Sequence, residues 1–216
     1  MCRARMFVHV QKTKNKIMAD KKIKLVLVSC CAPCSAGAIK QLADGDIAGI
    51  DDFIVLFYNP NIFPNEEYMR RMNEQIKYCN ELGVKYAIGD WDHDAWRGAV
   101  KGLENEPERG KRCDVCFAYR FAYARDFAIK NGFNAVASVL GVSKHKDQSQ
   151  VDAAAKRTLG DIEYIPIRWD ENLRVAIGRA SNFYRQNYCG CEFSFRKTPQ
   201  PAILGIKGCE TGNSSL

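Results

Sequence analysis

Short apolar runs alternate with helix-forming stretches along this chain, and that alternation constrains the fold more than any other feature. Strands separated by helices imply right-handed crossovers, so we expect a doubly wound α/β fold whose parallel sheet is covered on both faces. The four runs typical of buried strands are residues 24–29, 53–58, 84–88 and 134–140. Residues 164–167 predict a fifth strand at an edge, because Pro166 cannot donate to a neighbouring strand.

Helix start and stop signals lie between these runs. Ser35 is expected to cap a helix that reaches residue 42, Asn65 one that stops at Gly83, and Asp90 one that runs to about residue 103. Gly132 should stop a helix that begins near Cys113. The last two expected helices cover residues 147–159 and 171–186.

The charge of the chain is concentrated at one end. The net charge is +7 over 216 residues, yet residues 1–24 contain eight Lys and Arg and one acid, Asp20. The remainder is neutral overall, which predicts a local basic surface and a modest salt dependence of any polyanion binding. We therefore expect a disordered basic arm (1–22), a catalytic α/β domain (23–197) and a tail (198–216), with flexible terminal extensions flanking a single domain.

Hydropathy argues against a membrane protein. No apolar run approaches the roughly 20 residues that span a bilayer, and the apolar stretch 6–10 is too short for a signal peptide. A cytoplasmic protein is the expectation, and in that setting clustered cysteines indicate metal binding or redox chemistry rather than a disulfide framework.

The cysteines are grouped. Of the ten, seven fall into three motifs, whereas Cys79 stands alone among core positions and reads as a buried hydrophobic residue. The first motif follows the first strand, as residues 59–61 follow the second and 143–146 the fourth, so all three segments should meet at the carboxyl edge of the sheet. The motif cysteines are Cys30, Cys31, Cys34, Cys113, Cys116, Cys189 and Cys191.

Thiolates select zinc, copper(I) or iron–sulfur clusters, and seven exceed one tetrahedral site. They suffice for a four-thiolate iron–sulfur cluster plus a second metal with three thiolates and an open position. Cys113 and Cys116, three apart on a helix, should face the same side. The vicinal Cys30 and Cys31 should point in opposite directions, toward different metals. The alternative is a thioredoxin-like pair, Cys31 and Cys34.

Five ordered motifs make a resemblance specific. Residues 29–35 (SCCAPCS), 57–62 (FYNPNI), 110–116 (GKRCDVC), 142–146 (VSKHK) and 184–191 (YRQNYCGC) resemble the QueH-type epoxyqueuosine reductases over about residues 23–196. This resemblance implies a nucleotide α-hydrolase-like (HUP-like) fold and reduction of epoxyqueuosine to queuosine at the wobble position of tRNA. It also implies a [4Fe-4S] cluster, a nearby mononuclear iron and an external electron donor of unknown identity.

The resemblance also suggests roles for individual residues. Cys113 and Cys116 would hold the cluster with one member of each pair Cys30/Cys31 and Cys189/Cys191, and the remaining members would hold the second iron with Cys34. Asp114 and His145 are the candidate proton donors. The candidate contacts to substrate or RNA are Asn59, Asn61, Lys111, Arg112, Lys146, Tyr184, Arg185 and Tyr188.

Three other functions fit parts of the pattern. An ATP-dependent tRNA-modifying enzyme could share the fold, but residues 30–34 stand where its Gly-rich phosphate loop would be. A zinc-stabilised RNA-binding module would hold zinc and tolerate loss of Cys34. A thiol oxidoreductase would need Cys31 and Cys34 but not the cysteines of the other two motifs.

Overall fold

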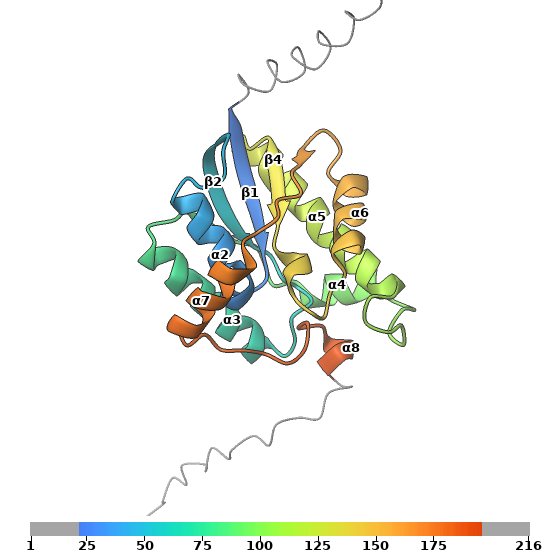
Figure 1. Ribbon diagram of the computed structural model, residues 1–216. Coiled ribbons are helices and arrows are strands. Elements are labelled where there is room, and N and C mark those ends of the chain that lie inside the picture. The colour runs from blue at the N-terminus through green and yellow to red at the C-terminus, as the bar shows by residue number, and fades with distance from the viewer. Residues whose placement is uncertain (1–21, 196–216) are drawn as a thin grey trace, which may run out of the picture.

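The computed structural model describes residues 22–195, which form an α/β fold around one five-stranded sheet (Figure 1). The strand order is β3-β2-β1-β4-β5, and every neighbouring pair is parallel. The doubly wound parallel sheet predicted from the sequence is therefore confirmed, with the last strand at an edge, although that strand ends at Tyr164, before Pro166. The strands are β1 (Ile23–Ser29), β2 (Ile50–Phe57), β3 (Tyr86–Ile88), β4 (Ala135–Ser138) and β5 (Glu163–Tyr164).

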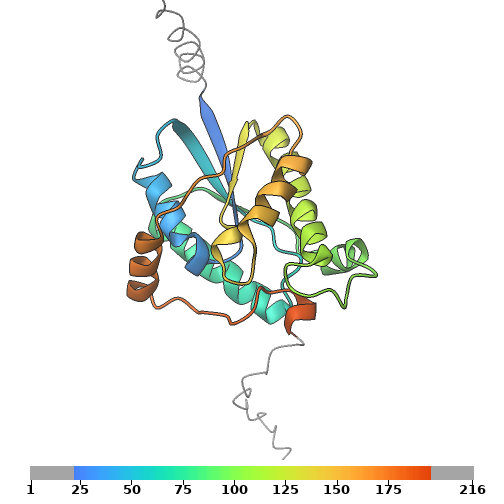
Figure 2. The same ribbon diagram turned by 45° about the vertical axis from the view of Figure 1, so that its right-hand side comes forward.

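Helices cover both faces of the sheet. Successive side chains of the central strand β1 point in opposite directions and are apolar on both faces, so each face needs a covering layer. Leu25 and Leu27 of β1 face the layer made by α2 (Ala32–Ala43), α3 (Asn65–Glu81) and α7 (Glu171–Ala180). Val26 and Val28 face α5 (Lys111–Asn131) and α6 (Gln148–Thr158). The two views of the ribbon show these layers on either side of the strands (Figures 1 and 2).

Two short helices lie at the carboxyl edge of the strands. Trp96 of α4 (His93–Ala99) packs with Cys116 of α5 and with Phe193 of α8 (Glu192–Phe195). This small apolar cluster joins the beginning of α5 to the end of the described chain.

Several helix ends agree with the sequence. Gly132 adopts a left-handed conformation (φ 71°) directly after α5, and Gly83 does the same (φ 64°) after α3. Asp147 caps α6 by accepting a hydrogen bond from the Gln150 amide at 3.0 Å. These ends depend on local backbone chemistry, which a sequence displays directly.

The expected caps of three helices are wrong. Pro64, rather than Asn65, is the N-cap of α3, and Asn65 is the first residue of that helix. Cys31, rather than Ser35, is the N-cap of α2, and Pro33 lies in its first turn, where a missing N–H costs nothing. The Ser35 hydroxyl instead donates to the Cys31 carbonyl at 3.0 Å. Asp92, rather than Asp90, caps α4 by accepting from the Ala95 amide.

Two helices also end earlier than expected. The helix α4 ends at Ala99, and α7 ends at Ala180 instead of residue 186. Asn182 has φ 48°, so the chain leaves the helical path there and residues 181–191 form an irregular segment. The predicted arm, apart from Lys22, and the predicted tail lie outside the described residues. Within residues 22–195, no helix has the length and apolarity needed to cross a membrane.

Candidate metal centre

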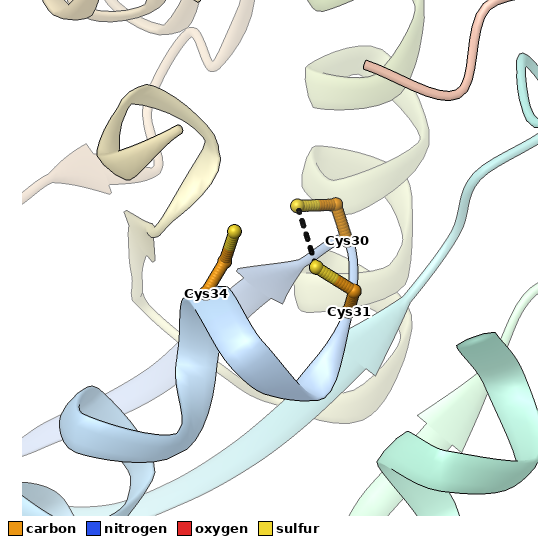
Figure 3. A group of neighbouring side chains, drawn as sticks. All are labelled: Cys30, Cys31 and Cys34. Atoms are coloured by element: carbon orange, nitrogen blue, oxygen red, sulfur yellow. Dashed lines mark hydrogen bonds between the residues drawn. The ribbon is translucent and has the colours of Figure 1, made fainter. Parts of the chain in front are cut away.

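The first cysteine group (Cys30, Cys31 and Cys34) occupies the junction of β1 and α2 (Figure 3). The three sulfur atoms lie within 4.8 Å of one another, and the sulfurs of Cys30 and Cys31 are 3.9 Å apart. Metal–thiolate bonds of about 2.3 Å in a tetrahedral site place sulfurs about 3.8 Å apart. The spacing therefore suits one shared metal ion. The expectation that Cys30 and Cys31 point in opposite directions is wrong, because the chain turns from strand to helix between them.

Protonation differs among these three thiols. Hydrogen bonds from Cys31 and then Cys34, aided by the Lys146 charge, hold the pKa of Cys30 well below its usual value. The Lys146 amine lies 3.6 Å from the Cys30 sulfur. Donation to Cys30 raises the pKa of Cys31 to about 11 and also raises the pKa of Cys34. The Gln186 amide donates to the Cys31 sulfur at 3.3 Å.

The second cysteine group (Cys113, Cys116, Cys189 and Cys191) lines one small cavity. Cys113 and Cys116 lie in the first turns of α5 and share a side, as their spacing predicts. Cys189 and Cys191 come from a turn in which Gly190 has φ 105°. The loop after β2 holds that turn, since Ile62 forms an antiparallel bridge with Cys191.

This group also contains one thiol that favours its charged form. A hydrogen bond from Cys191, with help from the Lys146 charge, lowers the pKa of Cys189 to about 6. Burial raises the pKa of Cys113 to about 11. Burial alone would lower the pKa of the Lys146 ammonium group. The negative charges of Cys30 and Cys34 outweigh this effect, so the pKa of Lys146 is raised. Lys146 therefore lies between the two groups and stabilises a thiolate in each.

Two buried arginines near the thiols were missed by sequence reasoning. Arg120 is 1% exposed, lines the cavity of the second group, and donates to the Tyr58 carbonyl at 3.1 Å and to Asn59 Oδ1. Arg71, also 1% exposed, donates to Glu67 at 2.7 Å and to the Cys189 carbonyl at 3.4 Å. Their charges offset those of buried thiolates. The only sequence signal for either arginine was the four-residue spacing of Glu67 and Arg71, which usually marks an exposed ion pair on a helix.

An open cleft of about 670 Å³ adjoins the first group and includes Cys34 in its wall. His145 lines both this cleft and the cavity of the second group. Its Nε2 atom is buried without a hydrogen-bond partner among residues 22–195, and its Nδ1 atom lies 3.5 Å from a Glu108 oxygen. The structure thus brings His145 to the thiols with one nitrogen available.

Asp114 is placed differently. Its carboxylate pairs with Arg157 of α6 at 3.0 Å and is 40% exposed. Asp114 does not belong to the described lining of the cleft or of the cysteine cavity. Its position in the first turn of α5 stabilises the helix dipole.

The candidate substrate contacts divide into two sets. Lys146 and Arg185 line the open cleft. Asn61 is 3% exposed and lines the cysteine cavity, where its Oδ1 atom has no hydrogen-bond partner within the described chain. These three are available to a ligand.

The other candidates are engaged inside the chain or lie away from the cleft. Asn59 is fully buried, donates to the Ser29 carbonyl at 3.0 Å and holds Arg120, so this geometry gives it a structural role. Arg112 is also buried and donates to the carbonyls of the loop at residues 103–106. It lines the cysteine cavity as well, and its Nε atom has no hydrogen-bond partner within residues 22–195. The rest are Tyr188, which donates to the Phe63 carbonyl at 2.6 Å, Tyr184, which lies under Arg70, and Lys111, which is exposed.

The sheet topology and the convergent thiols define a cysteine-rich protein of the nucleotide α-hydrolase-like class. Among solved structures, the U34-tRNA thiolase NcsA from Methanococcus maripaludis with its [4Fe-4S] cluster has a TM-score of 0.50. It is 16% identical and is matched over 86% of this chain and 68% of that chain, which supports the fold alone.

The family model described as "Epoxyqueuosine reductase QueH" matches residues 25–197, so the chain belongs to the epoxyqueuosine reductase QueH family. The epoxyqueuosine reductase QueH of Histophilus somni is 39% identical over 183 residues, covering 81% of this chain and 73% of the relative. The protein of the same name from Acinetobacter baylyi is 38% identical over 188 residues, covering 84% of each. These findings confirm the resemblance drawn from the five motifs.

Proposed function

We propose that this protein reduces epoxyqueuosine to queuosine at the anticodon wobble position of tRNA. The observation that carries the proposal is the gathering of seven free thiols beside an open cleft, in a chain of this family. A tRNA substrate implies action in the cytoplasm. Loss of the epoxide oxygen as water leaves an alkene and consumes two electrons and two protons, so an external electron donor is required.

The thiols and their surroundings fit a [4Fe-4S] cluster and a second iron. Soft thiolates are the ligands of such groups, and the buried cations near them offset the negative charge. In our proposal Cys113 and Cys116 hold the cluster, with one thiol from Cys30/Cys31 and one from Cys189/Cys191. The remaining thiols hold the second iron with Cys34, whose sulfur lies within 4.8 Å of those of both Cys30 and Cys31, so either of these two can join it at that iron. When bound, the cluster would pass single electrons and the iron would polarise the epoxide oxygen.

The protein's own side chains supply proton transfer and orientation. His145 is the proposed proton donor, because its unpartnered Nε2 lies where the open cleft meets the cysteine cavity. Asn61 Oδ1 can accept a hydrogen bond from a hydroxyl of the substrate. Lys146 stabilises a thiolate in each cysteine group, so we assign it an electrostatic role first. A contact to a phosphate of the tRNA would be its second role.

Metal analysis tests the proposal directly. Protein purified without oxygen should contain about five irons and about four acid-labile sulfides per chain, with a broad absorbance that dithionite bleaches. Turnover is then measured by nucleoside analysis of tRNA that carries epoxyqueuosine. A colourless protein that holds one zinc, has no sulfide and stays colourless after cluster reconstitution would instead favour the zinc-stabilised RNA-binding module.

A further inference from the structure

The open cleft does not end beside the cysteines. A second compartment of about 470 Å³ adjoins it on the side of β5, and both compartments share Val142, Glu171 and Arg174 in their walls. Each has a volume within the roughly 300–1,000 Å³ typical of small-molecule sites. One nucleoside at Cys34 therefore leaves the second compartment for another occupant.

We propose that the second compartment binds the base of a nucleotide next to the modified one, stacked on Trp169. This inference rests on the proposed function, because it takes the RNA strand to enter the cleft at Cys34. It adds that the site recognises a strand rather than a single nucleoside.

Trp169 has the properties of a fixed stacking platform. The indole is half-buried, and its Nε1 donates to the Ser138 carbonyl at the end of β4 at 3.0 Å. It packs against the apolar core on the α2 face and also lines the second compartment. Unpaired bases of RNA commonly stack on aromatic side chains held in this way.

The two compartments differ in their charged side chains, as expected if one RNA strand places its phosphates in the first compartment and a base in the second. The first has four cations, Lys144, Lys146, Arg174 and Arg185, against one carboxylate, Glu171, in its described lining. Such a wall suits backbone phosphates, which position a strand without reading its sequence.

In the second compartment the carboxylates are engaged within the chain. Asp152 accepts from Gln148 and from the Tyr164 hydroxyl, each at 2.6 Å, and Asp170 caps α7. Glu171 pairs with Arg174, and Arg168 is the other cation of this lining. With two cations against three carboxylates, and with Trp169 beside the apolar Ile167 and Pro166, this wall suits a base rather than a phosphate.

Binding of an unmodified anticodon stem-loop RNA to the metal-loaded protein tests the inference. Trp169→Ala should weaken binding about 10-fold, or about 1.4 kcal/mol, which lies within the usual range for one stacked base. Trp169→Phe keeps an aromatic face and loses the Nε1 donor, so its affinity should stay within about two-fold of the parent. If both variants weaken binding equally and lower the melting temperature, Trp169 is structural and the inference fails.

The RNA supplies a matched control. Removing the base at one neighbour of the wobble position should weaken binding to the parent about 10-fold and should not further weaken binding to Trp169→Ala. Additive losses, or no loss at either neighbour, overturn the inference. Should Trp169→Ala fail to fold, RNA-induced quenching of tryptophan emission that disappears in Trp169→Phe gives the same decision. None of these measurements needs turnover, so a protein that binds in this way but never reduces epoxyqueuosine would fail only the proposed function.

Discussion

The two cysteine groups reach the same edge of the sheet by different routes. The first comes from five consecutive residues at the β1–α2 junction, so its sulfurs lie within 4.8 Å of one another once that junction forms. The second combines the start of α5 with a turn more than 70 residues further along the chain. A site built from one segment is arranged by local structure, whereas a site built from two depends on how they dock.

Docking of the second group depends on a few buried contacts. The Arg71 guanidinium reaches the Cys189 carbonyl, and the Phe63 amide donates to the Gly190 carbonyl at 2.9 Å. The Tyr188 hydroxyl donates back to the Phe63 carbonyl at 2.6 Å. These contacts join the turn to α3 and to the loop after β2, so changes far from any thiol should affect the second group more than the first.

The largest expected effect comes from removing a thiol of the second group. Cys116→Ala should abolish turnover and lower the bound iron, as measured by metal analysis and nucleoside analysis. Cys79→Ala is the matched control, because Cys79 is also buried but packs in the core with its sulfur accepting from Gln75. The control should keep its iron and lose about 1 kcal/mol of stability. Unchanged turnover in Cys116→Ala would favour the thiol oxidoreductase that uses Cys31 and Cys34.

The next largest effect is expected from His145, which lies where the open cleft meets the cavity of the second cysteine group. His145→Gln should lower kcat by about 10²-fold or more, the usual contribution of a general acid, with bound iron unchanged. Asp114→Asn should have a much smaller effect, since that carboxylate pairs with Arg157 on α6. Single-turnover rates on epoxyqueuosine-containing tRNA decide between them, and the reverse ranking would assign the proton to Asp114.

The third effect is on stability rather than on turnover, and it comes from Arg71, the buried cation that holds the turn. Arg71→Met leaves the Glu67 carboxylate, only 8% exposed, without its cation and should cost about 3–5 kcal/mol of unfolding free energy. Denaturant unfolding measures the loss, and adding Glu67→Gln should restore part of it. A cost below about 1 kcal/mol would mean that the turn does not depend on this contact.

The smallest effect tests the turn itself. A Cβ at Gly190 would lie 3.0 Å from atoms of both Arg71 and Ile62, at φ 105°. Gly190→Ala should therefore cost about 2–3 kcal/mol, whereas Gly160→Ala, at φ 58° with open space around it, should cost about 1 kcal/mol. Thermal unfolding of both variants compares them, and equal costs would show that close packing at Gly190 contributes nothing.

Much of this molecule could be predicted from the sequence, because many of its determinants are local. Buried strands carry their own apolar patterns, and Gly132 marks the end of α5 by the conformation that it permits. The convergence of three segments at one edge follows from parallel topology alone. Ser35 misled the prediction of α2, since a good capping residue can also serve inside a helix by bonding to a carbonyl.

What the sequence did not reveal depends on long-range packing. Nothing local distinguishes the almost fully buried Arg71 from the exposed Arg70 beside it, or the equally buried Arg120 from the partly exposed Arg125 of the same helix. Tyr188 and Asn59 suggested ligand contacts by residue type, yet their polar atoms are used within the fold. Likewise, Trp169 gave no sign of lining a compartment until β4 and β5 were in place.

The β1–α2 junction has a consequence for how this architecture changes its chemistry. In nucleotide-binding proteins with doubly wound sheets, a glycine-rich loop and the positive end of a helix at this point hold phosphate. Here Pro33 and Cys34 fill the first turn of α2, so the same positive end lies beside sulfur. A scaffold suited to phosphate thereby accommodates thiolate. Replacing a few residues at one turn can exchange phosphate binding for metal binding while the strand order stays the same.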